Sequence, residues 1–284
     1  MKLSELLNKH SFKFSKKFGQ NFISDLNLLD KIVNLSGITE NDVVLEIGCG
    51  AGTLTKELAK KAKFVFGYEI DKTLQPVLAE NLGGVENCEI TFRDVMREKT
   101  ADIEKHIGEE YVIVANLPYY ITSPLVMKFI EQSQKCKAIV IMVQLEVAER
   151  FCALPGTPEY GAITAGINAV ADCEKLLFVP REMFYPRPNV DSEVVKIVFN
   201  KNKHCIASRE VYRETVRAAF SSRRKTLANN LSQGLKISKA QAENLILSCD
   251  LDPSVRGETL SSDRFCALSN AVVSYREKQT EKNG

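Results

Sequence analysis

The fold of this chain is decided by one stretch of its sequence, Val43-Val44-Leu45-Glu46-Ile47-Gly48-Cys49-Gly50-Ala51-Gly52-Thr53-Leu54-Thr55. The apolar run at its start is typical of a buried strand, the glycines are typical of a tight turn, and Leu54 and Leu58 indicate that a helix follows. A strand, a turn and a helix in this order predict an α/β fold with a parallel sheet. Because glycines let a ligand approach the main chain closely, the turn is also a candidate binding site.

The spacing of these glycines differs from the spacing that binds dinucleotides. The dinucleotide fingerprint is Gly-x-Gly-x-x-Gly, and Thr53 stands where its third glycine should be. A pyrophosphate prefers the free amides of a helix N-terminus, whereas Glu46 at the end of the strand suits a ligand that has an ammonium group or lacks phosphate. A nicotinamide-dependent dehydrogenase is therefore disfavoured. The scattered His10, His106 and His204 offer no hydride relay and argue against a metal site.

Two further strands are expected to end at acidic residues. Residues 64–69 and 89–92 form strand-like runs, and Glu69 and Asp94 lie at or just after their ends. Glu69 lies 23 residues after Glu46, where an acid can hold both hydroxyls of a ribose, and Asp94 can accept a hydrogen bond from an adenine amine. One such acid alone would be a solvated loop residue, but three at successive strand ends beside a glycine-rich turn favour a binding site.

A second candidate site follows the apolar run at residues 111–115, which is expected to be a buried strand. It is the segment Asn116-Leu117-Pro118-Tyr119, in which the proline fixes its own φ and favours an extended leucine. The asparagine oxygen and a nearby main-chain carbonyl could then accept from one donor group beside the tyrosine ring. This arrangement suits a planar ring with an exocyclic amine, such as adenine. A strand that ends in an ordinary turn is the alternative, since Asn and Pro both favour turns.

The rest of the chain supplies further expected elements. A proline-rich loop at residues 179–188 contains Phe184, which we expect to cover the second face of the bound ring, with packing in the core as the alternative. The other expected elements are a helix from Ser24 to Gly37, a helix with Ser123 as N-cap and Pro124 as its first residue, strands at 137–143, 175–179 and 194–199, and helices at 238–249 and 262–276.

The composition is that of an ordinary globular protein with one large and one small domain. The chain has 284 residues, of which 44% are apolar and 26% are charged. Its apolar runs are too short to span a membrane, its start lacks the apolar core of a signal peptide, and its eight cysteines form no C-x-x-C pair. We therefore expect a cytoplasmic protein with reduced thiols, without a metal site and without membrane association.

The net charge of +2 is distributed unevenly. Residues 200–284 contain 15 Lys and Arg against 9 Asp and Glu, and the first twenty residues contain five lysines against one glutamate. Lysine alternates with phenylalanine at residues 13–23, a mixture that suits phosphate contact and stacking. Basic charge at both ends of an acidic centre favours a polyanionic partner, with an ordinary solvated surface as the alternative.

Taken together, these segments resemble the ribosomal RNA adenine N6-dimethyltransferases. Glu46–Gly52 resembles the first motif of Rossmann-like S-adenosylmethionine methyltransferases, and Asn116–Tyr119 resembles the motif that binds the target amine. Lys17-Phe-Gly-Gln-Asn-Phe22 and Phe184-x-Pro-x-Pro-x-Val-x-Ser192 resemble further family motifs, and the resemblance covers about residues 13–270.

Within the family, Ala219-Phe220-x-x-Arg223-Arg224-Lys225-x-Leu227 resembles the members that act on small-subunit rRNA. The erythromycin-resistance methylases, which modify large-subunit rRNA, do not as a rule carry this segment. Cys49 and Ile23 depart from the proline and leucine that the family usually has, and both changes are small.

The resemblance implies a domain and a role for each segment. It implies a Rossmann-like class I methyltransferase sheet at residues 1–200, and the helical pattern after residue 208 adds an all-helical RNA-binding domain at 201–276 and a disordered tail at 277–284. S-adenosylmethionine would be bound by Gln20, Asn21, Phe22, Glu46, Gly48, Gly50, Gly52, Glu69, Ile70, Asp94, Val95 and Asn116. The target adenine would be held by Asn116, Leu117, Tyr119 and Phe184. Contacts to rRNA would come from Lys16, Lys17, Arg217, Arg223, Arg224 and Lys225.

The activity implied by the resemblance is methyl transfer to the N6 atoms of two adjacent adenines in the loop of the 3′-terminal hairpin of small-subunit rRNA. The substrate would be the rRNA or the assembling small subunit, and the enzyme would act as a monomer. Two alternatives stay open at this point: a large-subunit rRNA methylase that confers antibiotic resistance, and a relative that binds nucleic acid without catalysis.

Overall fold

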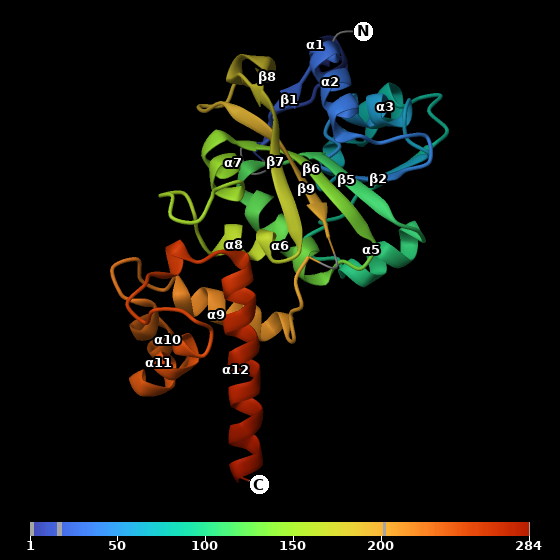
Figure 1. Cartoon of the computed structure of the whole chain (residues 1–284). Coiled ribbons are helices and arrows are strands. Elements are labelled where there is room, and N and C mark those ends of the chain that lie inside the picture. Colours follow the sequence, from blue (N-terminus) through green and yellow to red (C-terminus); the bar gives the residue numbers. More distant parts are fainter. Residues whose placement is uncertain (1–2, 16–18, 201–202, 284) are drawn as a thin grey trace. The chain divides into compact units, whose positions relative to one another are not determined.

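The computed structural model describes residues 3–15, 19–200 and 203–283. The chain divides into two compact units (Figure 1). The first consists of Met1–Ala148 and Glu174–Phe199, and the second consists of Glu149–Cys173 and Asn200–Gly284. Among the described residues, no helix combines the length and the apolar character that crossing a membrane requires.

A seven-stranded sheet organises the first unit, in the order β4-β3-β2-β5-β6-β9-β7. Its strands are β2 (Val43–Ile47), β3 (Phe64–Tyr68), β4 (Cys88–Thr91), β5 (Tyr111–Asn116), β6 (Cys136–Gln144), β7 (Ala171–Val179) and β9 (Ser192–Phe199). The strands from β4 to β6 are parallel, and β9 runs antiparallel to β6. Because β2 and β5 are neighbours although β3 and β4 lie between them in the chain, their carboxyl ends form the topological switch point where α/β sheets bind ligands.

The first unit also contains helices, and several of them pack on its sheet. They are α1 (Leu3–Lys9), α2 (Leu26–Ser36), α3 (Thr53–Ala59), α4 (Gln75–Asn81), α5 (Thr100–Ile107), α6 (Thr122–Gln132) and α7 (Leu145–Phe151), the last of which continues into the second unit. Alternate strand residues such as Val44, Val112 and Val140 pack against the apolar side chains of α2 and α3. The predicted Rossmann-like α/β fold is thereby confirmed, with strands buried on both faces as parallel sheets require.

A separate two-stranded sheet joins the start of the chain to the proline-rich loop. β1 (Phe22–Ile23) and β8 (Phe184–Tyr185) are antiparallel, with Phe22 opposite Tyr185 and Ile23 opposite Phe184. Segments more than 160 residues apart in the sequence therefore lie side by side next to the Gly-rich turn.

The second unit is helical and has its own core. It contains α8 (Ala162–Asn168), α9 (Arg209–Ala219), α10 (Leu227–Leu235), α11 (Lys239–Leu247) and α12 (Ser262–Asn283). Tyr160 and Ala165 pack in one cluster with Tyr212, Leu231 and Phe265. Residues 149–173 therefore group with the C-terminal helices, which differs from the expected division at residue 200, because Tyr160 and Ala165 are buried in the helical core.

The structure differs from the sequence-based expectations at two helix ends. The tail expected to be disordered from residue 277 is helical through Asn283, and no helix-breaking residue lies between Arg276 and Gly284. Arg276, just before this segment, forms a bidentate ion pair with Glu214 of α9. α6 begins at Thr122 and not at Pro124, and Ser123 is not its N-cap. The chain enters α6 directly from the 3₁₀ turn η3 (Tyr119–Ile121), so a side-chain cap is not used.

Candidate active site

A cavity of about 320 Å³ lies at the carboxyl ends of β2, β3 and β5. All of the predicted cofactor residues except Gly52 line it, and so do Leu117 and Tyr119. Gly52 is the N-cap of α3, with a left-handed φ of 77°, and an added Cβ there would meet Leu78 at 3.0 Å. The structure therefore brings the predicted residues together at one cavity, from four separate strand ends and from the segment around residue 20.

The Gly-rich turn is bound to the end of the neighbouring strand by Glu69. Its carboxylate accepts hydrogen bonds from the main-chain N–H of Gly50 and of Asp71, both at 2.8 Å. Gly50 has a φ of 57°, and an added Cβ would lie 2.7 Å from the Phe22 ring, so only glycine fits there. Burial raises the pKa of Glu69, and the nearby charge of Asp71 raises it further. Glu69 is thus a rigidly held acceptor in the cavity wall.

Glu46 is the most deeply buried acid of the site, with 1% of its surface exposed. It shares one face of β2 with Val44, and the Thr55 side chain of α3 lies near its carboxyl group. Its Oε2 has no hydrogen-bond partner among the described residues, and neither has Thr55 Oγ1. Burial raises the pKa of Glu46 to about 8, and the charge of Glu69 contributes to this rise. The Thr55 hydroxyl lies near enough to oppose it, although the two groups do not form a hydrogen bond.

Gln20 fixes the N-terminal segment against the cavity and uses both ends of its amide in doing so. Its Nε2 donates to Asp71 Oδ2 at 2.7 Å, and its Oε1 accepts from Ser15 N at 3.0 Å. Asp71 was not predicted as part of the site, although it follows Glu69 by two residues and could have been found as a further acid at the same strand end.

Asn116 at the end of β5 has a defined amide orientation. Its Nδ2 donates to the main-chain oxygen of Asn21 at 2.9 Å, and this carbonyl partner requires the NH₂ group to face it. No described residue donates to Asn116 Oδ1, which therefore remains an available acceptor at the cavity. The neighbouring Tyr119 is half-buried, its hydroxyl bonds Ser192 Oγ at 2.9 Å, and burial raises the pKa of Tyr119. The tyrosine ring is thus held in place through its hydroxyl group.

Phe184 does not line this cavity. Its side chain is 5% exposed and packs with Ile23, Leu29 and Val179 in the core on the α2 side of the sheet. The alternative considered from the sequence, a core side chain, describes this packing. Stacking of Phe184 on a target base stays a prediction that requires the ring to be uncovered.

The charged groups of the cavity wall show what the site can bind. Among the described residues that line it, Glu46, Glu69 and Asp94 are the acids, and Arg93 is the single basic residue. This set suits a ligand with positive charge and with hydroxyl and amine donors, and it disfavours a pyrophosphate. In the part of the chain that the structure describes, no group of three or more His, Cys, Asp and Glu side chains is arranged to hold a metal ion.

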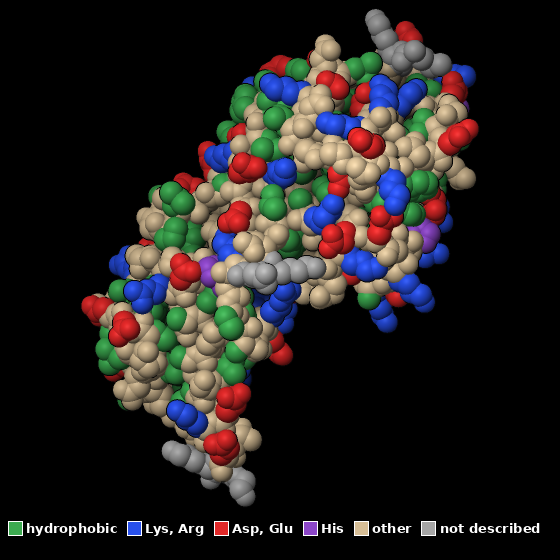
Figure 2. All heavy atoms as spheres, turned by 45° about the vertical axis from the view of Figure 1, so that its right-hand side comes forward, with side chains coloured by type: hydrophobic (Ala, Val, Ile, Leu, Met, Phe, Trp, Pro, Cys, Tyr) green, Lys and Arg blue, Asp and Glu red, His purple; other side chains and the backbone are tan. Residues whose placement is uncertain are grey.

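The predicted RNA contacts have different surroundings. Lys16 and Lys17 lie outside the described residues. Arg217 and Arg224 are exposed, and neither side chain bonds another described residue, whereas Lys225 Nζ donates to Gln233 at 2.9 Å. On the face drawn in Figure 2, basic and acidic side chains are interspersed and form no large area of one sign.

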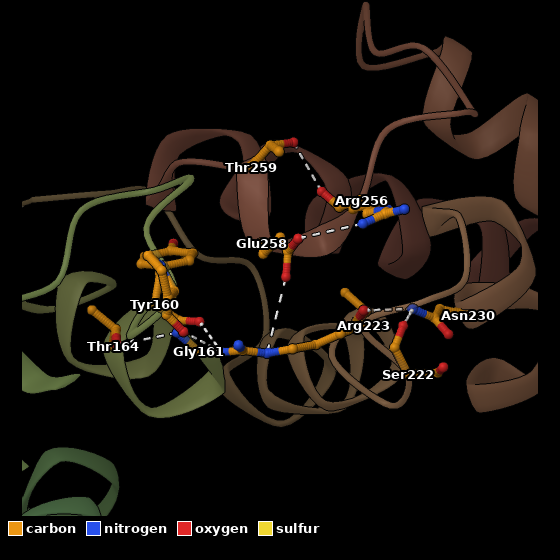
Figure 3. Close-up of polar contacts among 11 residues, drawn as sticks. Tyr160, Gly161, Thr164, Ser222, Arg223, Asn230, Arg256, Glu258 and Thr259 are labelled. Atoms are coloured by element: carbon orange, nitrogen blue, oxygen red, sulfur yellow. Dashed lines mark hydrogen bonds and ion pairs between the residues drawn. The ribbon is translucent and has the colours of Figure 1, made fainter.

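Arg223 is engaged inside its own unit (Figure 3). Its Nη2 donates to the main-chain oxygens of Pro158 and Tyr160 at 2.7 and 3.1 Å, and its Nε lies 3.9 Å from Glu258. Glu258 also lies 3.9 Å from Arg256. Arg223 therefore holds the loop before α8 in place. To contact rRNA as well, its guanidinium group would have to do so while keeping these hydrogen bonds.

Comparison with known proteins agrees with this geometry. A family model described as ribosomal RNA adenine dimethylase matches residues 11–272. Proteins named ribosomal RNA small subunit methyltransferase A from Clostridioides difficile and Geobacillus thermodenitrificans are both 41% identical to this chain. The alignments cover 94% and 95% of this chain, and 94% of each relative.

Two solved structures are similar in both fold and sequence. A dimethyladenosine transferase from Plasmodium falciparum has a TM-score of 0.76 and 26% identity, covering 91% of this chain and 98% of that one. The 23S rRNA methyltransferase ErmE has a TM-score of 0.68 and 25% identity, covering 89% of this chain and 100% of that one. The extent of the family match and the identity of these relatives show that the chain belongs to the ribosomal RNA adenine dimethylase family.

Proposed function

We propose that this protein uses S-adenosylmethionine to dimethylate the exocyclic N6 of two adjacent adenines in the loop of the 3′-terminal hairpin of small-subunit rRNA. The observation that carries the proposal is the orientation of Asn116, whose Oδ1 is an available acceptor beside a cavity rich in carboxylates. The relatives named as small-subunit methyltransferases support the choice of rRNA, as does the segment at residues 219–227. We further propose that it acts as a monomer in the cytoplasm on the assembling subunit.

The cavity residues fit the proposed cofactor. Glu69 would accept from the ribose hydroxyls and Asp94 from the adenine amine, while the unpartnered Oε2 of Glu46 offers a buried acceptor near the turn. Gly48 and Gly50 allow the main chain to lie against the ligand. When bound, S-adenosylmethionine supplies a methyl group on a positively charged sulfur, which is an excellent leaving group.

The residues of the β5 end would act on the target nitrogen. An adenine N6 is a poor nucleophile because its lone pair is delocalised into the ring. Asn116 Oδ1 and the Leu117 carbonyl, by accepting from the two N–H groups, would favour a more tetrahedral nitrogen whose lone pair is localised. Positioning of this kind can supply most of the rate, so a strong general base is not required. A base must leave the stack to reach this point, and Tyr119 would stack on it.

Methyl transfer to isolated ribosomal subunits tests the proposal. The protein is incubated with radiolabelled S-adenosylmethionine and with small or large subunits that lack adenine dimethylation, and the nucleosides are then analysed. We expect N6,N6-dimethyladenosine only in small-subunit rRNA. Label in large-subunit rRNA would support the antibiotic-resistance alternative, and binding of RNA without transfer to either subunit would support the non-catalytic one.

Asn116→Ala tests the role of the amide. We expect transfer to fall by about 100-fold or more, because the acceptor for the target amine is lost, while the affinity for S-adenosylhomocysteine changes by less than about threefold. The measurement is single-turnover transfer together with calorimetry. Asn87→Ala is the matched control, because its side chain also donates to main-chain oxygens, those of Ala59 and Ala62, away from the cavity. A large loss of cofactor affinity in Asn116→Ala would contradict the assigned role.

A further inference from the structure

Lys128 on α6 makes an unusual set of hydrogen bonds. Its ammonium group donates to the main-chain oxygens of Val95 and Met96, at 2.7 and 3.4 Å, and to that of Glu98. An ammonium group has three N–H donors, and here each can meet a carbonyl oxygen. Its pKa is lowered by burial, and the carboxylates of Asp94 and Glu98 oppose this effect. A half-buried lysine is therefore anchored on the main chain of another segment and on no single carboxylate.

The three carbonyls belong to the loop that follows β4 and enters the cavity. Asp94 and Val95 of this loop line the cavity. Within the loop, Asp94 Oδ1 accepts from Met96 N at 3.0 Å, and the Asp94 main-chain oxygen accepts from Arg97 N at 3.0 Å. These local bonds bend the loop, but they do not connect it to the rest of the fold. Lys128 makes that connection, across 30 to 33 residues of sequence.

The position of Lys128 along the chain links this loop to the target-binding segment. α6 begins at Thr122, directly after the 3₁₀ turn that follows Asn116–Pro118. Its packing against α5 and β6 fixes the helix. A side chain on this helix therefore sets the distance between the loop with Asp94 and the segment with Asn116.

We propose that Lys128 is a positioning residue that holds the adenine-binding loop of the cofactor site in register with the target-binding segment. The inference rests on the proposed function, because it takes the residues after β4 as the site of the cofactor adenine. Lys128 does not touch the reacting atoms and acts only through the Val95–Glu98 main chain. Without it, the loop loses three charge-assisted hydrogen bonds and samples positions in which Asp94 does not meet the adenine amine.

Calorimetry with the full-length protein tests this inference. Lys128→Met keeps the apolar stem and removes the ammonium group. We expect its affinity for S-adenosylhomocysteine and for adenosine alone to fall by about tenfold each, which corresponds to about 1.4 kcal/mol. Adenosine is the discriminating probe, because it occupies only the end of the site that the loop holds. In methyl transfer, the KM for S-adenosylmethionine should rise while kcat at saturating cofactor stays within about twofold.

Two further variants separate positioning from general stability. Lys135→Met is the matched control, since Lys135 Nζ donates to a single main-chain oxygen, that of Gly108, on the exposed surface at the start of β6. We expect its ligand affinities to match the wild type. Lys128→Arg should bind more tightly than Lys128→Met, because it keeps the positive charge. It should regain only part of the affinity, because its donors lie in a planar fork that does not match the three carbonyl oxygens.

The possible outcomes distinguish the inference from the proposed function. Wild-type affinity for adenosine in a folded Lys128→Met protein would overturn the inference, and so would a loss seen with S-adenosylhomocysteine and absent with adenosine. If Lys128→Met does not fold, equal affinities of Lys128→Arg and the wild type for both ligands would overturn it. A wild-type protein that binds neither ligand would instead overturn the proposed function, and the inference with it.

Discussion

At the scale of the residue, Glu46 is a buried carboxyl group whose ionisation is unfavourable in the folded protein. A carboxyl group that is 1% exposed and lacks a partner on one oxygen would lose much of its hydration if it were ionised, so the folded protein favours its neutral form. In an unfolded chain the same residue would ionise near the ordinary glutamate pKa of 4.5, whereas its pKa in the folded state is about 8. A buried carboxyl group with a raised pKa is expected at a binding site where a positively charged ligand offsets the cost of ionising it.

The linkage between this pKa and stability predicts the behaviour of Glu46→Gln. Between about pH 4.5 and 8 the folded state binds more protons than the unfolded state, so this group reduces stability progressively as the pH rises through that interval. Glutamine has no such titration. We expect Glu46→Gln and the wild type to have similar stability near pH 4.5, and the variant to be more stable by on the order of a few kcal/mol at pH 8.

Denaturant unfolding at pH 4.5, 6 and 8 measures this difference. Glu243→Gln is a control for the substitution itself, because Glu243 lies on the surface of α11 and its ion pair with Lys239 is long, at 3.7 Å. Glu69 is present in both the wild type and the Glu46→Gln variant, so the difference in stability between these two proteins reports on Glu46. A stability difference that does not change with pH would contradict the buried neutral carboxyl group.

At the scale of the element, the turn before α10 carries two adjacent arginines with different surroundings. Arg223 donates to the main-chain oxygens of Pro158 and Tyr160, and Gly156 N donates to the Glu258 main-chain oxygen at 2.8 Å. The loop before α8 is therefore held by residues 65 and about 100 positions later in the sequence. Arg224 has no such bonds to the described residues, although it is the next residue in the same turn.

Alanine substitutions of these two arginines compare a side chain that bonds another segment, Arg223, with one that bonds no described residue, Arg224. We expect Arg223→Ala to lower the free energy of unfolding by about 1–2 kcal/mol, because two carbonyl oxygens lose a charged donor at a half-exposed site. Arg224→Ala should change it by less than about 0.5 kcal/mol. Chemical unfolding monitored by circular dichroism measures both. Equal effects of the two substitutions would contradict the bonding that the structure shows for Arg223.

At the scale of the whole molecule, the charge distribution matters more than the net charge of +2. Basic residues are in excess after residue 200, in the part of the chain that forms most of the helical unit. Because each phosphate contact releases condensed counterions, a basic surface that binds RNA has an affinity that falls steeply with salt concentration. A surface that is merely solvated has no such dependence.

Charge reversal tests this surface. We expect Arg217→Glu and Arg224→Glu each to weaken binding of a small-subunit hairpin RNA and to reduce the slope of log K against log salt concentration by roughly 1, because one phosphate contact is lost. Filter binding over a range of about 50 to 300 mM salt measures the slope, and Lys239→Glu on α11 controls for the change in net charge. An unchanged slope would remove Arg217 or Arg224 from the interface.

Much of the site could be predicted from the sequence because its signals are local. Gly48 and Gly50, the acids at the strand ends and Asn116 after an apolar run all follow from short-range patterns, and the structure brings them to one cavity. Phe184 and Arg223 were different, because an aromatic ring and an arginine carry no local signal that tells a core or loop contact from a ligand contact. The end of α12 was also missed, and the ion pair of this helix with Glu214 joins residues 62 positions apart in the sequence.

The amino-acid sequence by itself determined the α/β fold, the Gly-rich turn and the end of β5 as the parts of the site, because hydrophobic period and backbone preference are properties of neighbouring residues. Only the tertiary structure decided which way the Asn116 amide faces, where Phe184 packs, and that Lys128 and Arg223 hold other segments. The hydrogen-bond partners of Asn116, Lys128 and Arg223 lie 30 to 95 residues away in the sequence, and such distances are closed only when the chain packs.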